Sequence, residues 1–288
     1  MSEIGPWGSR DGRVAPSVVT SVPADEASRP IRQAQVQTQA LDKGQNPVWA
    51  IVSTLLLGGL IWWFSGSLIV AGSAIFGLFV HEYGHVLAMN RLGMGPARIY
   101  IIPFLGGLAK GQRNPRSEWD GVLAALAGPA FGLLAAIPVV GLWYATGDAE
   151  WLMGAFFIAM INLINLAPAP PLDGSKALGP VLARVDPMLE KVALIAIGAL
   201  VVWWGVTTGR YILAVFLGIA LLGHLRAGAW RPEDGARLTW PQAGKSLFLF
   251  VATGVACAAA ALGTLLPLAD GSPTEAVNVA LRFIGVER

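Results

Sequence analysis

Charge, cysteine and histidine are all scarce in this sequence. Only 13% of its 288 residues are charged, against about 25% in typical soluble domains, and its mean hydropathy is +0.59. The 20 basic and 18 acidic residues include no Lys- or Arg-rich run, so the charge pattern of a nucleic-acid-binding protein is absent. Because Cys257 is the only cysteine, an intramolecular disulfide and a CxxC-type zinc site are excluded. Any metal must therefore be held by histidine and carboxylate.

The beginning of the chain differs in composition from the rest. Residues 1–46 carry five basic and five acidic residues with Pro, Ser and Gln between them, which is typical of a disordered polar arm. No short apolar run with a small-residue cleavage site follows a basic start, so we expect no cleavable signal peptide. We therefore expect the arm to stay on the protein.

Long uncharged runs follow the arm. Glu82 is the only charged residue between residues 47 and 90, a stretch that can hold two membrane spans of about 20 residues each, with a tight turn at residues 64–67. Further uncharged runs cover residues 121–147, 151–172, 192–209, 211–225 and 246–269. The sequence therefore predicts an all-α polytopic membrane protein with about six to seven transmembrane helices.

Lys and Arg are distributed unequally between the predicted loops. If the amino terminus is cytoplasmic, the arm and the loops on its side hold most of the basic residues. The other side has none at residues 65–67 or 146–150, and only Arg210, Arg282 and Arg288 elsewhere. Because short cytoplasmic loops retain Lys and Arg, we expect a multi-pass protein with a cytoplasmic amino terminus, in a bacterial cell (inner) membrane.

One motif in the second predicted span carries chemistry. Residues 81–85 read His-Glu-Tyr-Gly-His, the H-E-x-x-H pattern, on a predicted helix. His81 and His85 lie on one helical face, about 6 Å apart, so both can bind one Zn²⁺ while Glu82 acts as a general base on water. A solvated surface is the alternative, but ionisable groups inside an apolar span are costly unless they are paired or bound. If the helix ends shortly after the motif, the site lies about 8–14 Å from the cytoplasmic surface.

A catalytic zinc needs a third protein ligand and an open position for water. Three residues are candidates. His224 lies at a predicted helix end, where histidine usually sits in the interface, and Glu118 lies in a polar loop, where it is expected to be solvated. Asp173 follows three prolines in four positions, which cannot continue a helix, and unwound backbone at membrane depth is tolerated where it lines a polar cavity. The sequence favours Asp173.

Two motifs together resemble the site-2 protease family of intramembrane zinc metalloproteases. One is H-E-x-x-H within an apolar span, and the other is N-x-x-P-x-x-P-L-D-G at residues 165–174. The resemblance covers about residues 50–180 and implies hydrolysis of a peptide bond in a membrane-embedded substrate. It also implies site residues: one zinc ion per chain on His81, His85 and Asp173, activation of water by Glu82, and binding of the substrate or the developing oxyanion by Asn165.

Two shorter segments strengthen the resemblance, and one position departs from it. Residues 103–107 (PFLGG) resemble a glycine-containing segment that forms strand-like structure beside the family's site, and residues 127–129 (AGP) resemble its A-G-P. The family often has an Asn where this chain has Gly132, so a hydrogen bond between helices made by that Asn is expected to be lost. Gly128 and Gly132 instead form G-x-x-x-G, which permits close approach of helices, and we favour ordinary packing over a direct substrate role for them.

A β-prone segment follows the motif helix. Residues 98–104 (RIYIIPF) favour a strand, with Pro103 at an edge position. A helical substrate hides its carbonyl groups in intrahelical hydrogen bonds, so we expect an extended substrate that adds to this segment as a further strand. A loop that only plugs the cytoplasmic side is the alternative. The expected substrate-strand residues are Ile99, Ile101, Gly106 and Gly107.

The sequence thus predicts four parts: a polar cytoplasmic arm (1–46), a metalloprotease core (47–180), additional transmembrane helices (181–272) and a short, amphipathic tail (273–288). The expected function is intramembrane zinc proteolysis of a transmembrane protein or peptide in the lipid bilayer, without nucleic acid; a homo-oligomer is compatible with it. A non-proteolytic zinc-binding or transport protein on the same scaffold is the alternative. Glu82 favours the protease, since a carrier has no use for a base beside a ligand.

Overall fold

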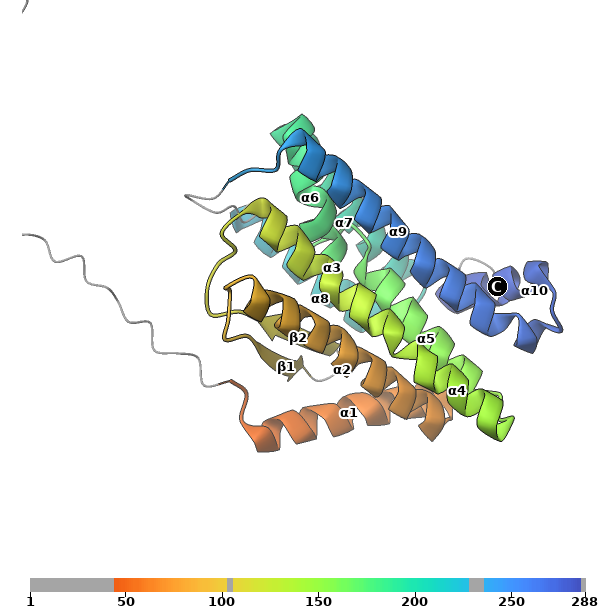
Figure 1. The fold of residues 1–288 in the computed structure, drawn as a ribbon. Helices are drawn as coiled ribbons and strands as arrows, with labels where there is room; N and C mark the ends of the chain where they lie inside the picture. The colour runs from red at the N-terminus through yellow and green to blue at the C-terminus, as the bar shows by residue number, and fades with distance from the viewer. Residues whose placement is uncertain (1–43, 103–105, 228–235, 286–288) are drawn as a thin grey trace, which may run out of the picture. The chain divides into compact units, whose positions relative to one another are not determined.

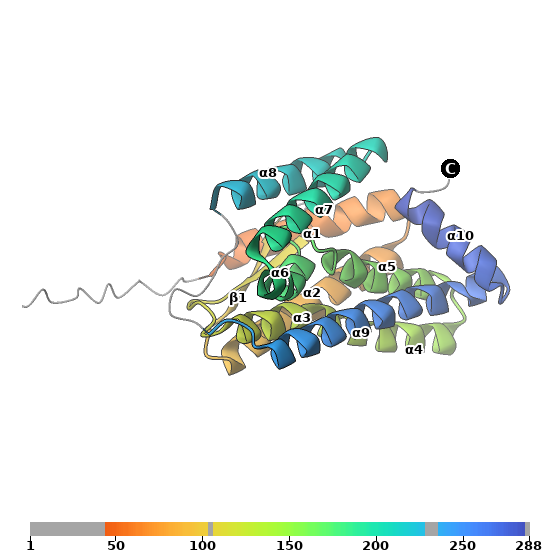
Figure 2. The ribbon, with the colours of Figure 1, turned by 90° about the horizontal axis from the view of Figure 1, so that it is seen from above.

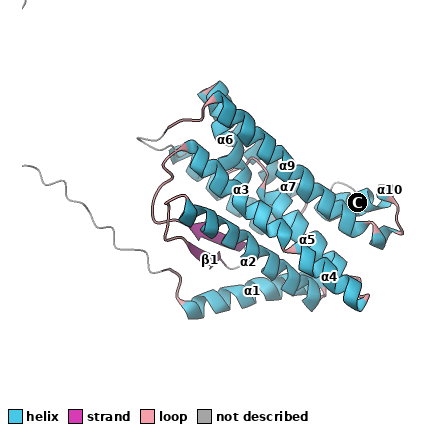
Figure 3. Cartoon of the chain, in the orientation of Figure 1, coloured by secondary structure: helices cyan, strands magenta, loops and turns pink. Residues whose placement is uncertain are grey.

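Helices make up most of the described chain, with a single pair of strands beside them (Figures 1 and 3). The computed structural model describes residues 44–102, 106–227 and 236–285, which lie within one unit, Asp42–Arg288. Most of the predicted arm, up to residue 43, lies outside the described residues. The same holds for Pro103 and Phe104 of the predicted strand segment.

Ten α-helices and one short 3₁₀ helix are present in the described ranges. They are α1 (Pro47–Ser65), α2 (Leu68–Arg91), α3 (Glu118–Leu134), α4 (Ala136–Thr146), α5 (Glu150–Asn165), α6 (Asp173–Val185), α7 (Pro187–Thr207), α8 (Tyr211–Ala227), α9 (Trp240–Leu265), η1 (Pro267–Ala269) and α10 (Pro273–Ile284). Strands β1 (Arg98–Ile102) and β2 (Gly106–Lys110) pair antiparallel, with Arg98 opposite Lys110 and Ile102 opposite Gly106. The predicted strand-like segment is therefore part of a hairpin.

The turn predicted at residues 64–67 is confirmed. Helix α1 ends at Gly66, whose φ of 69° lies in the left-handed region that glycine adopts without strain. Ser67 then caps α2, because its hydroxyl oxygen accepts a hydrogen bond from the Val70 backbone N–H at 3.1 Å. The two helices that follow the arm are thus separated by only two residues.

Four helical stretches of the described chain are long and apolar enough to cross a membrane: Pro47–Ser65, Glu118–Thr146, Pro187–Thr207 and Trp240–Leu265. Two further apolar helices, Glu150–Asn165 and Ala214–Arg226, are shorter. The run predicted at residues 121–147 is one apolar stretch that divides into α3 and α4 at Ala135. These findings agree with an all-α membrane protein, and the larger count of about six to seven spans stays a prediction.

The outer surfaces of these helices are apolar. Large exposed hydrophobic side chains occur along α1, α7 and α9, among them Trp63, Phe64, Leu200, Trp203 and Phe248. Exposed apolar side chains in such number are unusual for a protein surrounded by water, and they suit contact with lipid.

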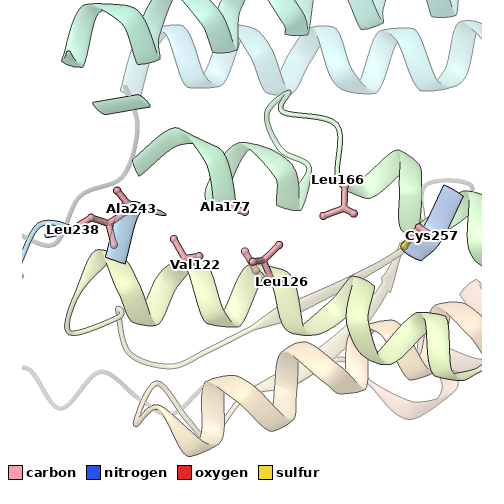
Figure 4. Close-up of a cluster of buried hydrophobic side chains, with 8 residues drawn as sticks. Val122, Leu126, Leu166, Ala177, Leu238, Ala243 and Cys257 are labelled. Carbon is pink, nitrogen blue, oxygen red and sulfur yellow. The ribbon is translucent and has the colours of Figure 1, made fainter. Parts of the chain in front are cut away.

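A buried apolar core joins α3, α6 and α9. Figure 4 shows Val122 and Leu126 of α3 facing Ala177 of α6. Residues of α9, including Cys257, complete the same cluster. A second cluster joins α5 to α9, and Phe283 of α10 packs on Phe156 with ring centroids 5.0 Å apart. The tail that was predicted to be short and amphipathic thus contains the helix α10.

Helix α2 is surrounded by partners on several sides. It packs against α1, α3 and α5, and the β-hairpin lies beside it (Figures 1 and 2). Helices α3 and α5 also contact each other. Polar residues on the face of α2 that is turned toward these two helices are therefore buried between the helices.

Candidate metal centre

Helix α2 brings three polar side chains of the H-E-x-x-H motif into the interior. His81, Glu82 and His85 are all buried, and the two imidazole rings lie edge to face with centroids 4.8 Å apart. Gly84 lets α2 approach α3 closely, since an added Cβ atom there would lie 2.6 Å from the Ala127 carbonyl oxygen. The close packing of α2 on α3 is thus what buries the motif.

Asp173 reaches the same place through the break between α5 and α6. The prolines of residues 168–171 stop α5, as predicted, and α6 begins at Asp173. A carboxylate in the first turn of a helix is stabilised by the helix dipole. Gly174 is required here, because an added Cβ atom would lie 2.0 Å from the Leu166 carbonyl oxygen. The turn therefore seats α6 directly against the end of α5, with Asp173 buried.

Three electron-pair donors converge at this point. The Nε2 atoms of His81 and His85 lie 3.1 Å apart, and Oδ2 of Asp173 lies 3.2 Å from the first and 3.1 Å from the second. The other carboxylate oxygen, Oδ1, lies 3.8 Å from the Lys176 ammonium group. Among the described residues, His81, His85 and Asp173 form the group that could hold a metal ion.

The hydrogen bonds of the two imidazole rings leave their Nε2 atoms free to act as ligands. Nδ1 of His85 lies 2.7 Å from the Ala124 carbonyl oxygen, which can only accept, so Nδ1 donates. Nδ1 of His81 donates to the Asn162 side-chain oxygen at 2.8 Å. In each neutral ring the second nitrogen, Nε2, then carries a lone pair.

These donors fit a zinc ion. Two imidazole lone pairs and a carboxylate oxygen repel one another at 3.1–3.2 Å unless a cation lies between them. Zinc bonds of about 2.0–2.1 Å in tetrahedral geometry place ligand atoms about 3.3 Å apart. The donor atoms are therefore spaced as a tetrahedral site requires, and two histidines with one carboxylate are a ligand set that zinc enzymes use.

Glu82 lies next to these donors and against the hairpin. Ala109 of β2 contributes a backbone hydrogen bond to its carboxylate. Gly107 makes room for the side chain, since an added Cβ atom there would lie 2.4 Å from Cγ of Glu82. A cavity of about 420 Å³ opens at this point, lined by the motif residues, β2, Asn165, Asp173 and the α8 residues Phe216, Ile219 and Ala220. The donors and Glu82 thus line one cavity together.

Two comparisons with known proteins gave matches. The family model of peptidase family M50 matches residues 70–148. A protein of Synechocystis sp. with the name "Putative zinc metalloprotease sll0528" is 29% identical over 173 residues, which are 52% of this chain and 44% of that protein. These matches confirm the resemblance to the site-2 protease family. This chain thus spans less than half the length of that relative. No solved structure matches the chain.

The site-2 protease match covers only part of the candidate centre. Residues 70–148 contain His81, Glu82 and His85, but they end before Asp173. The structure brings Asp173 to the matched part through the turn before α6. The assignment of Asp173 as the carboxylate donor therefore rests on the structure and not on the family model.

The G-x-x-x-G segment of α3 makes room for side chains of the site. An added Cβ atom at Gly128 would lie 2.2 Å from Nε2 of His85, and one at Gly132 would lie 2.1 Å from the Asn162 side-chain oxygen. Close helix packing was expected from the sequence, and it is observed. The reason for it is more specific than expected, because each glycine admits one polar side chain of the centre.

The remaining predicted residues lie in different places. Asn165 lines the cavity, and its amide nitrogen donates to the Ile161 carbonyl at 3.1 Å. Ile99 and Ile101 of β1 line a separate apolar cavity of about 380 Å³, between α1, α2 and β1. Glu118 is buried and accepts a hydrogen bond from the Leu238 N–H at 2.8 Å. The surface solvation expected for Glu118 is thus wrong, because that backbone amide partners its carboxylate. Gly106, another of the expected substrate-strand residues, begins β2 opposite Ile102.

The two other candidate ligands, Glu118 and His224, do not line the cavity of the centre. One residue of the centre, Asn162, was not expected from the sequence. It lies one helical turn before Asn165, within the uncharged run of residues 151–172. That spacing places both asparagines on the same side of α5, which is the signal that could have indicated it.

Proposed function

We propose that the chain is an intramembrane zinc metalloprotease that hydrolyses a peptide bond in a membrane-embedded substrate. The observation that carries the proposal is the convergence of His81, His85 and Asp173 within 3.2 Å, with Glu82 beside them in a cavity. The similarity to family M50 and the apolar helices support it. One chain supplies all the proposed ligands, so one zinc ion per chain suffices and the site does not require an oligomer.

The chemistry divides between the metal and the side chains. Zinc held by His81, His85 and Asp173 would polarise the scissile carbonyl and make water acidic enough to react near neutral pH. Glu82 accepts a proton from the attacking water and delivers it to the leaving amine. Asn165 lines the same cavity and keeps one amide hydrogen beyond its bond to Ile161, which suits it to hold the substrate or the developing oxyanion.

The hairpin has two edges, and only one of them faces the metal centre. Gln45 occupies the outer edge of β1: its amide nitrogen donates to the Ile101 carbonyl at 2.9 Å, and its amide oxygen accepts from the Ile101 N–H at 2.8 Å. Both peptide groups of Ile101 therefore point away from β2. In an antiparallel pair the opposite residue, Gly107, then also points its peptide groups outward, on the other side.

Ala109 lies two residues after Gly107 and points its peptide groups to the same edge; its backbone hydrogen-bonds to Glu82, and β2 lines the cavity. We therefore assign the substrate strand to the outer edge of β2, at Gly107, with β1 and its residues Ile99 and Ile101 supporting β2 from behind. An extended substrate paired there lies directly beside the general base. Gly106 begins the same strand with a φ of 114°, a backbone conformation that glycine adopts without strain.

Strand addition at β2 predicts a two-residue period in the substrate. A single N-methyl group on every second peptide group of the scissile segment should lower kcat/KM about fivefold or more. Each such methyl group removes one backbone hydrogen bond worth about 1 kcal/mol. Methylation at the positions between them should have little effect. Cleavage of a set of singly N-methylated transmembrane peptides by the purified protein measures this.

A variant distinguishes the two edges of the hairpin. Gln45→Ala frees the β1 edge at Ile101, while Asn46→Ala alters the neighbouring amide, which caps α1 by accepting from the Val48 N–H. With the substrate on β2, both variants should keep the wild-type KM within about twofold and preserve the two-residue period. A KM several-fold lower in Gln45→Ala alone would instead assign the substrate to the β1 edge. An equal loss at every methylated position would argue against strand addition.

The proposed setting is a bacterial cell (inner) membrane with a cytoplasmic amino terminus. The unequal distribution of Lys and Arg between the loops supports this orientation. The motif lies between six and ten residues before the end of α2 at Arg91, about 9–15 Å at 1.5 Å per residue, and this short distance supports an active site near the cytoplasmic side. The partners are then the lipid bilayer and a transmembrane protein or peptide.

Metal removal tests the proposed function. Detergent-purified full-length protein, treated with a chelator and then freed of it, should lose cleavage of a transmembrane peptide, and added Zn²⁺ should restore it. Zinc content and product masses are measured on the same sample. A protein that binds one zinc ion per chain but cuts no peptide would favour the alternative, a zinc-binding or transport protein.

A further inference from the structure

Asn162 is a polar side chain at the centre of an apolar helix. It is fully buried on α5, a helix that contacts both α2 and α3. Burial of an amide is costly unless its groups are hydrogen-bonded. The two partners of Asn162 are the imidazole of His81 and the carbonyl of Ile158.

These partners determine how the amide is oriented. The Ile158 carbonyl oxygen can only accept, and it lies 2.7 Å from the Asn162 amide nitrogen. The amide oxygen is thereby turned toward Nδ1 of His81 at 2.8 Å, so this nitrogen must carry the proton. In the neutral ring Nε2 then carries no proton, and it is the atom that faces His85 and Asp173.

Gly132 supplies the space in which the Asn162 amide lies. An added Cβ atom at Gly132 would lie 2.1 Å from the amide oxygen and 2.8 Å from the amide carbon and nitrogen. This is the position at which the sequence departs from the resembling family, where Asn is frequent. The hydrogen bond expected to be lost with that Asn is replaced by one from the opposite helix, α5.

We propose that Asn162 is a positioning residue that holds His81 in the tautomer able to bind metal, and that Gly132 is the complementary space it requires. The inference rests on the proposed metal centre. An acceptor that is hydrogen-bonded to the second nitrogen of a metal-binding histidine raises the basicity of the ring and fixes its orientation. Asn162 does not itself touch the cavity, so its effect on hydrolysis is indirect.

Two asparagine variants on one helix test this assignment. Asn162→Leu removes the acceptor with little change of shape, and it should weaken zinc binding by about 10- to 100-fold in competition with a chelator. Asn165→Leu, one turn further along, should keep the wild-type zinc affinity within about threefold, because the Asn165 amide nitrogen donates to the Ile161 carbonyl and not to a ligand. Equal zinc affinities in the two variants would overturn the proposal.

The tautomer itself can be observed without metal. ¹⁵N NMR of histidine-labelled, metal-free protein should show His81 protonated at Nδ1 in the wild type and in Asn165→Leu, and a mixture of tautomers in Asn162→Leu. A purely structural role of Asn162 would leave the His81 signals unchanged. Since this readout needs no zinc, it separates a failure of this inference from a failure of the proposed function.

Exchange of the two residues gives an independent test, which also applies if Asn162→Leu fails to fold. Gly132→Asn alone should weaken zinc binding, since the new side chain meets Asn162. The double variant Gly132→Asn/Asn162→Gly places the acceptor on α3 and should recover zinc affinity to within about threefold of wild type, with His81 again protonated at Nδ1. A double variant no better than Gly132→Asn would contradict the complementary pair.

Discussion

Replacement of Glu82 by Gln should reduce peptide hydrolysis by about 10²- to 10⁴-fold and leave zinc binding unchanged. Glutamine has nearly the same size, and it can still face Gly107 and accept the hydrogen bond from Ala109. What it lacks is a group able to take a proton from water. The three donors that would hold zinc are untouched, so the effect should appear in kcat and not in zinc content.

The measurement is cleavage of a transmembrane peptide by wild-type and Glu82→Gln protein, with zinc content determined on the same preparations. The variant also separates the two candidate functions, since a zinc carrier should keep its metal affinity and its transport without a base. A Glu82→Gln protein that still cuts the peptide at the wild-type rate would remove Glu82 from the mechanism. Another proton acceptor in the cavity would then be required.

Local patterns in the sequence predicted the parts of the site that depend on one element. His81 and His85 four residues apart on a helix must share a face, and prolines 168, 170 and 171 must end a helix, whatever packs around them. The turn after α1 was predicted for the same reason, since Gly66 ends α1 and Ser67 caps α2 through contacts with residues only three or four positions away. The approach of Asp173 to α2 was favoured from its motif, and the donor distances agree with it.

Features that depend on contacts between elements were not predictable in this way. Asn162 lies in the uncharged run of residues 151–172, where it belongs to no motif. Its hydrogen bond to His81 is possible because Gly132 of α3 has no side chain to fill the space of the amide. The break between α3 and α4 at Ala135 interrupts a run with no charge to mark it. Likewise, a β-prone segment does not reveal which edge of a hairpin will be covered, and here Gln45 from before α1 covers one.

Replacement of Asp173 by Asn should remove both zinc and cleavage. Asn has the size of Asp but no negative charge, and it cannot balance a divalent cation between two neutral imidazoles. The loss of zinc affinity should exceed the 10- to 100-fold loss that we expect for Asn162→Leu. Asp173→Asn changes a ligand itself, whereas Asn162→Leu changes only a residue that orients a ligand. Gly174 and the start of α6 are unaltered, so the fold around the turn should persist.

Glu118→Gln is the matched control for this variant. Glu118 is also a buried carboxylate, but its oxygen accepts from the Leu238 N–H and does not line the cavity of the centre. Glutamine can keep that hydrogen bond, so Glu118→Gln should retain zinc and cleavage near the wild-type level. Zinc bound normally by Asp173→Asn would mean that the third ligand lies elsewhere, and His224 on α8 would be the next residue to replace. Loss of zinc in Asp173→Asn alone would leave the carboxylate at the start of α6 as the ligand that completes the site.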